Sequence, residues 1–92
     1  MSATPKPPTE LPSHDDVRGV LAYNVRLLRV QRDWSQEELA MECELDRTYV
    51  SAVERSRWNV SLANIQKLAA ALGTEPWLLL RPPDSDSSAK VP

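Results

Sequence analysis

The chain has 92 residues, a formal net charge of −2 and a single cysteine. This length allows one small domain with a modest core, and the acidic average excludes a protein that coats nucleic acid or membrane through a large basic excess. One cysteine excludes an intramolecular disulfide, and no apolar run is long enough for a bilayer helix. The composition therefore predicts a cytoplasmic protein without membrane contact.

Proline is concentrated at the two ends of the chain. Residues 1–12 mix proline with Lys, Thr and Glu, and residues 81–92 contain Pro82, Pro83 and the run DSDSS. Proline interrupts helices, and these segments have little apolar surface to bury. We expect a flexible Pro-rich arm over 1–12 and a flexible tail over 81–92, on either side of a folded domain over 13–80.

The first predicted helix covers residues 15–32, with Ser13 as its N-cap. Apolar residues recur at helical spacing along it, and they are expected to form its inward stripe. This stripe comprises Val17, Leu21, Val25 and Leu28. No run of alternating Val, Ile or Thr indicates a strand anywhere in the chain, so the sequence predicts an all-α fold.

A signal for the start of a helix occurs three times further along. It consists of an apolar residue, a polar N-cap and a second apolar residue four positions after the cap, which together form a hydrophobic staple. The three copies are Trp34-Ser35-Leu39, Leu45-Asp46-Val50 and Val60-Ser61-Ile65. In the first copy, Ser35 and Glu38 also have the spacing of a capping box.

These signals predict helices over 36–43 and 47–55 and a further helix after Ser61. Gly73 is expected to end that helix as a left-handed C-cap. A short helix should follow over 75–80. The predicted architecture is a compact five-helix bundle.

The segment LDRTYVSAVERSRW, residues 45–58, predicts a helix with two different faces. At about 100° per residue, Val50 and Val53 fall on one side of the helix. The opposite side carries Arg47, Thr48, Ser51, Ala52 and Arg55. Two short helices joined by a tight turn, the second with an exposed polar face, form the helix-turn-helix arrangement, whose second helix enters the DNA major groove.

The composition of this polar face favours DNA over simple solvation. It contains arginine, threonine and serine but no Glu, Asp or Lys. Arginine makes bidentate contacts with guanine, and hydroxyl side chains reach bases or phosphates. The alternative is a merely solvated helix face, which would ordinarily mix charges of both signs.

The block RLLRVQRDWSQEELAMECELDRTYVSAVERSRWNVSLANIQKLAAALG, residues 26–73, resembles the lambda repressor-like helix-turn-helix domain of phage repressors, Cro and xenobiotic-response-element regulators. The shared features include SQEELA, Val50, Glu54 and the terminal LAAALG. Within that family, LDRTYVSAVERSRWNVSL looks most like the controller proteins of restriction-modification systems. Those proteins are small homodimers that bind operators upstream of their own genes.

The resemblance implies a role for each matching residue. It assigns base reading to Arg47, Thr48, Ser51 and Ala52. It assigns DNA-backbone contacts to Gln36, Tyr49, Arg55, Arg57 and Asn59. Arg29 and Glu54 match a pair that ties the first helix to the recognition helix, and an internal ion pair is favoured over a DNA contact by Arg29.

The chain departs from the family pattern at three positions. Glu44 stands where the family often has Gly or Asn, and Asp33 stands where it often has Gly, so a left-handed backbone would be less favourable at both positions. Trp58 stands where controller proteins tend to have a polar or basic residue. Because of this third departure, the operator sequence and the contacts to the DNA backbone are expected to differ from those of controller proteins.

The run Trp77, Leu78, Leu79 and Leu80 predicts self-association. Four large apolar residues in succession surround a short helix, so a monomer's core should leave one face exposed. We expect these residues to form the two-fold interface of a homodimer that reads a pseudo-palindromic operator. In the alternative, all four pack beneath the helix over 15–32. A regulator that activates transcription would also contact RNA polymerase.

Catalysis has few candidate residues. His14 is the only histidine, Cys43 has no histidine nearby in the sequence, and the two glycines cannot form a phosphate-binding loop. No Cys or His spacing indicates zinc. We expect no enzyme activity, no metal and no cofactor. The remaining alternative to DNA binding is a protein-interaction module, such as an antitoxin-like partner whose Pro-rich arm wraps another protein.

Overall fold

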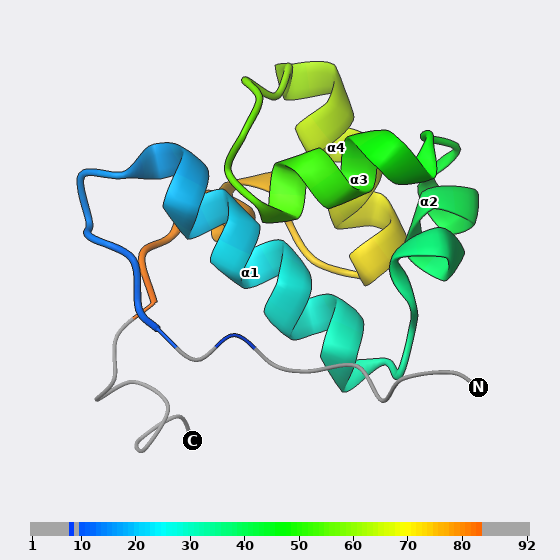
Figure 1. Cartoon of the computed structure of the whole chain (residues 1–92), viewed down its shortest axis with the longest axis horizontal. Helices are drawn as coiled ribbons and strands as arrows, with labels where there is room; N and C mark the ends of the chain where they lie inside the picture. Colours follow the sequence, from blue (N-terminus) through cyan, green and yellow to red (C-terminus); the bar gives the residue numbers. More distant parts are fainter. Residues whose placement is uncertain (1–7, 9, 84–92) are drawn as a thin grey trace.

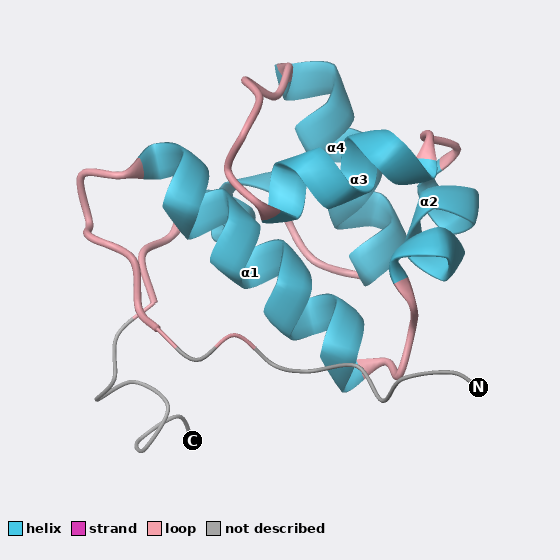
Figure 2. Cartoon of the chain, in the orientation of Figure 1, coloured by secondary structure: helices cyan, strands magenta, loops and turns pink. Residues whose placement is uncertain are grey.

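The computed structural model describes residues 8 and 10–83, and its regular structure there is entirely helical (Figures 1 and 2). The elements are α1 (Val17–Gln31), α2 (Gln36–Cys43), α3 (Arg47–Glu54), α4 (Leu62–Leu72) and a 3₁₀ helix η1 (Pro76–Leu80). The all-α prediction is confirmed, but the fifth helix is not an α-helix. Pro76 removes a backbone donor at the start of a five-residue segment, and Leu78 N–H donates to the Glu75 carbonyl at 3.0 Å in the 3₁₀ pattern.

The start of α1 differs from the prediction. The N-cap is Asp16, whose Oδ1 accepts from Gly19 N–H at 2.9 Å, whereas the carbonyl of the predicted cap, Ser13, closes a turn before the helix. Val17, the first residue of α1, is 59 % exposed. Val20 is buried instead, so the predicted inward stripe is wrong at its first position.

The three predicted caps further along are confirmed. Ser35 Oγ accepts from Glu38 N–H at 3.0 Å and Glu38 Oε1 accepts from Ser35 N–H at 2.7 Å, which completes the capping box. Asp46 caps α3 by accepting from Thr48 N–H, and Ser61 caps α4. Each cap satisfies a backbone donor that the helix itself leaves without a partner.

Left-handed backbone occurs at four described positions. Gly73 has φ +70° and forms the predicted C-cap of α4, while Asp33, Glu44 and Ser56 each have φ 59°. The chain therefore adopts the left-handed conformation at 33 and 44 even though neither residue is glycine. Each non-glycine residue in this conformation costs about 1–2 kcal/mol.

The core lies where α1, α2, α3 and α4 meet, and it is closed by η1. Its fully buried large side chains are Val20, Val25, Leu39, Val50, Val53, Leu68, Leu72 and Leu79. Figure 1 shows α3 crossing the molecule with α2 beside its N-terminal end. α3 packs on both α1 and α2, so its orientation is determined by two neighbouring helices.

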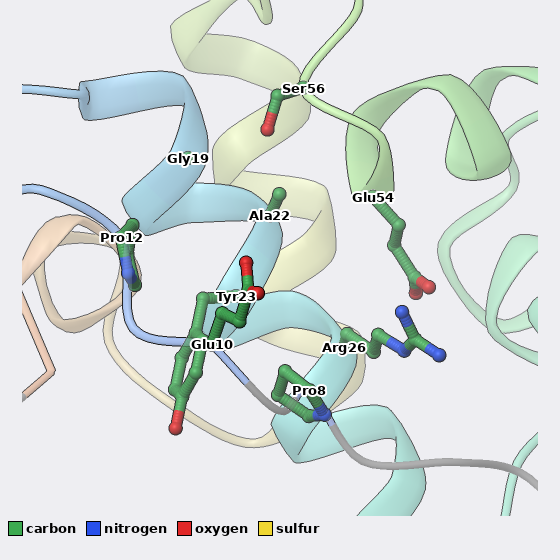
Figure 3. Close-up of a pocket in the computed structure, with 9 residues that line it drawn as sticks. All are labelled: Pro8, Glu10, Pro12, Gly19, Ala22, Tyr23, Arg26, Glu54 and Ser56. Carbon is green, nitrogen blue, oxygen red and sulfur yellow. The ribbon is translucent and has the colours of Figure 1, made fainter. Parts of the chain in front are cut away.

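Most of the predicted arm and tail, residues 1–7, 9 and 84–92, lies outside the described residues. Pro8, Glu10 and Pro12 line a shallow hollow on α1 together with Tyr23 and Arg26 (Figure 3). No described helix combines the length and the apolar composition needed to cross a membrane.

Candidate nucleic-acid interface

The second helix of the helix-turn-helix, α3, has the predicted apolar face, but its polar face is exposed only in part because Ser51 and Ala52 are buried. Val50 and Val53 are at most 1 % exposed, whereas Arg47 and Thr48 at its N-terminus are exposed. The valines hold α3 on the core through apolar burial. The guanidinium of Arg47 and the hydroxyl of Thr48 are therefore presented to solvent at the end of the helix that offers backbone N–H groups.

A hollow of about 280 Å³ lies over this exposed face. It is lined by Arg47, Thr48, Ser51, Ala52, Arg55, Arg57 and Trp58. Three of the lining residues are arginines and none carries a carboxylate. An anion placed here meets positive charge and hydroxyl groups without a repelling group in the lining.

Ser51 and Ala52 line this hollow although only 8 % and 9 % of their surfaces are exposed. Ser51 Oγ accepts a hydrogen bond from Arg55 Nη2 at 2.7 Å, which holds the Arg55 side chain along the helix. Small side chains at these positions allow a ligand to approach the helix backbone closely. A ligand must, however, enter the hollow to contact either of them.

Glu54, at the end of α3, is held by α1 and α2. Arg29 donates to it twice, from Nε to Oε2 at 2.7 Å and from Nη2 to Oε1 at 2.9 Å, and the two side chains are only 7 % and 3 % exposed. Arg29 Nη1 also donates to the Trp34 carbonyl at 2.7 Å. Figure 3 shows the Arg26 guanidinium turned toward the Glu54 carboxylate. The two hydrogen bonds from Arg29 to Glu54 tie α3 to α1.

Gln36 takes part in the same network. Its Nε2 donates to Glu54 Oε1 at 3.1 Å, and the side chain is half-buried. The resemblance implies a phosphate contact at this position, but in the structure this donor already has an internal partner. Among the backbone N–H groups at the start of α2, that of Glu38 already donates to Ser35 Oγ.

Tyr49 and Asn59 occupy different surroundings. The Tyr49 hydroxyl accepts from Asn64 Nδ2 at 3.0 Å, which leaves its own proton able to donate. Its ring centroid lies 5.7 Å from that of Trp58.

Asn59 instead lines a separate hollow between the start of α1 and the start of α4. From the sequence, Trp58 is only a departure from the family pattern, although an aromatic residue next to Arg57 is a possible signal of a binding surface.

The run Trp77 to Leu80 is divided between core and surface. Leu79 is fully buried within its own chain, and Leu78 and Leu80 are half-buried, so only Trp77, at 66 % exposed, lies largely on the surface. Asn24 Nδ2 fixes η1 by donating to the Leu79 carbonyl at 2.8 Å. This arrangement corrects the prediction that all four residues form an interface, because the core of the same chain already binds part of the run.

Cys43 lies in α2 and does not line the hollow over α3. Its thiol is buried and donates to the Leu39 carbonyl at 3.0 Å. Burial raises the pKa of the Cys43 thiol above its ordinary value, so the group stays protonated at neutral pH. It behaves as a small apolar core residue.

Comparison with known proteins agrees with this geometry. The family model described as helix-turn-helix matches residues 25–77. A Neisseria meningitidis hypothetical transcription factor is 66 % identical over 76 residues, which cover 83 % of this chain and 72 % of that protein. Control protein C.BamHI from Bacillus amyloliquefaciens is 46 % identical over 67 residues, covering 72 % and 83 % of the two chains.

Solved structures also include similar proteins that are transcription factors or controller proteins. The crystal structure of the hypothetical transcription factor NHTF from Neisseria has a TM-score of 0.87 at 59 % identity, covering 92 % of this chain and 98 % of that one. The restriction-modification controller protein C.AhdI from Aeromonas hydrophila has a TM-score of 0.64 at 48 % identity, covering 73 % and 98 %. The chain therefore belongs to the helix-turn-helix family and is similar to restriction-modification controller proteins.

Proposed function

We propose that the protein is a transcriptional regulator that binds a pseudo-palindromic operator as a homodimer, in the manner of a controller protein. The observation that carries this proposal is the hollow on α3, where Arg47, Thr48 and Arg57 meet without a carboxylate. The similarity to C.BamHI and C.AhdI, a control protein and a restriction-modification controller protein, supports the same class. C.Esp1396I, which shares the fold at 24 % identity, is described as a tetramer in complex with its 35 base-pair operator.

In this proposal α3 lies in the major groove with its N-terminal end toward the bases. The Arg47 guanidinium pairs with the O6 and N7 acceptors of guanine, and Thr48 reaches a neighbouring base edge or phosphate. Ser51 and Ala52 contact bases only when the groove wall enters the hollow. Arg55 and Arg57 neutralise phosphates on the strand beside the groove, which positions the helix without reading sequence.

A homodimer gives this interface its specificity. One recognition helix reads a few base pairs, whereas two helices about 34 Å apart read both halves of a palindrome. The surface that we assign to the dimer lies beside η1 and is mainly apolar, with Asp15, Asp16 and Arg18 also lining it. Trp77 shares a face of the 3₁₀ helix with Leu80, three residues later, and Leu80 lines a hollow of about 570 Å³ that is also lined by the exposed Val17 and Leu62.

The remaining assignments follow from this function. Residues 13–80 form the DNA-binding domain. The protein acts in the cytoplasm, where bacterial DNA lies, and it has no catalytic role. Transcription reconstituted with RNA polymerase on the selected operator would distinguish activation from repression.

The test is selection of bound duplexes from a random pool by the full chain, followed by sequencing. We expect enrichment of two related half-sites in inverted orientation, with centres separated by about one helical turn or a multiple of it. Guanine should be enriched in each half-site because Arg47 is the exposed base reader. A pool that shows no enrichment over the starting material, at low and at physiological salt, would contradict the proposal.

A further inference from the structure

Trp58 lies on the DNA-facing hollow but is not used by the mechanism described above. It belongs to the loop between α3 and α4, and its side chain is 48 % exposed. Together with Arg47, Arg55 and Arg57 it lines the hollow over α3. It is thus the one large apolar side chain in an otherwise small, polar and basic lining.

The Trp58 ring packs against a second aromatic residue, Tyr49. Tyr49 lies against it at a centroid distance of 5.7 Å with the rings tilted by 45°, and Asn64 donates to the Tyr49 hydroxyl from α4. The indole therefore packs on Tyr49 of α3, whose hydroxyl is in turn held by Asn64 of α4. A side chain held in this way loses little additional freedom when a ligand covers its exposed surface.

The indole N–H is also available. In the described part of the chain, Trp58 Nε1 donates to no protein atom. A tryptophan that served only to pack the loop would gain most by burying its ring and pairing its N–H internally. Trp58 instead keeps half of its surface and its only polar group available beside three arginines.

We propose that Trp58 is an uncharged contact to the DNA backbone. Its ring packs on a deoxyribose of the strand whose phosphates Arg57 contacts, and Nε1–H donates to a phosphate oxygen. This inference rests on the proposed function, because it requires a duplex seated on α3. It differs from the arginine contacts in one respect: it adds affinity without releasing a counterion.

The experiment compares salt dependence among variants of the full chain on one duplex obtained by selection. Trp58→Ala should weaken binding about ten- to thirtyfold, from lost apolar burial and one lost hydrogen bond, and should leave the slope of log K against log salt unchanged. Trp58→Phe keeps the ring but lacks the donor, so its loss should be about threefold. Arg57→Ala should instead flatten the slope by about 0.9, and Trp58→Arg should steepen it by about 0.9.

A scrambled duplex provides the second readout. A backbone contact weakens binding to the selected and scrambled duplexes by the same factor, so the Trp58→Ala specificity ratio should equal that of the original chain. Met41→Ala is the matched control, because Met41 is an apolar residue 70 % exposed on α2 and outside the hollow. It should bind both duplexes unchanged.

Several outcomes would overturn the proposal. The first is an unchanged DNA affinity of Trp58→Ala, and the second is a loss of its affinity for the selected duplex alone. The third is a shift of the monomer–dimer equilibrium of Trp58→Ala, measured by sedimentation. The fourth is that Trp58→Phe and Trp58→Ala weaken binding equally and lose thermal stability to a matching extent. Trp58→Arg keeps the test valid if the alanine variant unfolds, since a steeper slope requires the position to lie at a phosphate. If the original chain itself retains no duplex, the proposed function fails rather than this inference alone.

Discussion

Arg47 and Arg57 line the same hollow, but they are expected to contribute differently to binding. Arg47 begins α3, and in the proposed complex it contacts base edges, so Arg47→Ala should cost about 1–3 kcal/mol and relax the preference at one base pair of each half-site. Arg57 follows the helix, and in the proposed complex it contacts the backbone, so Arg57→Ala should weaken all duplexes alike and flatten the salt dependence. Titration of selected and scrambled duplexes at several salt concentrations measures both effects. An equal loss on every duplex for both variants would contradict base reading by Arg47.

The Arg29–Glu54 pair also acts at the scale of single residues, through stability instead of DNA contact. Its charged groups are almost fully buried, so Glu54→Ala would leave a buried guanidinium without its partner. We expect a loss of about 3–5 kcal/mol in the free energy of unfolding, measured by chemical denaturation.

The double variant Arg29→Met with Glu54→Leu serves as the control. It removes both charges together and should recover much of the stability, because no charge is then left buried alone. If Glu54→Ala unfolds at the same denaturant concentration as the original chain, the pair does not hold α3 on α1.

At the scale of elements, the ends of α2 and α4 use the same backbone conformation with different residues. Gly73 ends α4 at φ +70° and Glu44 ends α2 at φ 59°. Glu44→Gly should stabilise the fold by about 0.5–1 kcal/mol, because it removes left-handed strain and a carboxylate from a helix C-terminus. Chemical denaturation measures the change.

Gly73→Ala is the converse substitution, and it should destabilise the fold by about 1–2 kcal/mol. The added Cβ would also meet the Arg32 guanidinium, which donates to the Leu72 carbonyl at this helix end. Glu44→Ala separates the two contributions at position 44, because it removes the charge and keeps the strain. If Glu44→Ala stabilises as much as Glu44→Gly, the gain comes from charge alone.

At the scale of the whole molecule, the proposed dimer depends on the apolar surface beside η1. Leu62→Arg and Trp77→Arg change side chains that are 78 % and 66 % exposed, so the monomer should fold normally. Each should shift the chain from dimer to monomer at micromolar concentration, because a charged group would be buried in the interface. Sedimentation velocity measures the shift, and binding to a full operator should fall more than binding to a half-site. Met41→Arg, on a surface outside the proposed interface, should stay dimeric.

Several helix ends could be predicted from the sequence alone. The starts of α2, α3 and α4 follow from caps and staples within five residues of one another, and Gly73 marks the end of α4 in the same way. The inward position of Val50 and Val53 follows from helical spacing. Such signals are readable because each depends on neighbours along the chain.

The sequence by itself therefore determined the starts of α2, α3 and α4, the end of α4 and the inward position of the α3 valines. Only the tertiary structure decided that Leu79 is buried while Trp77 is exposed, that Gln36 bonds to Glu54, and that Trp58 joins the arginines over α3. The physical reason is distance along the chain. A cap is satisfied within a few residues, whereas burial and side-chain pairing between elements depend on groups that come together only when the helices pack.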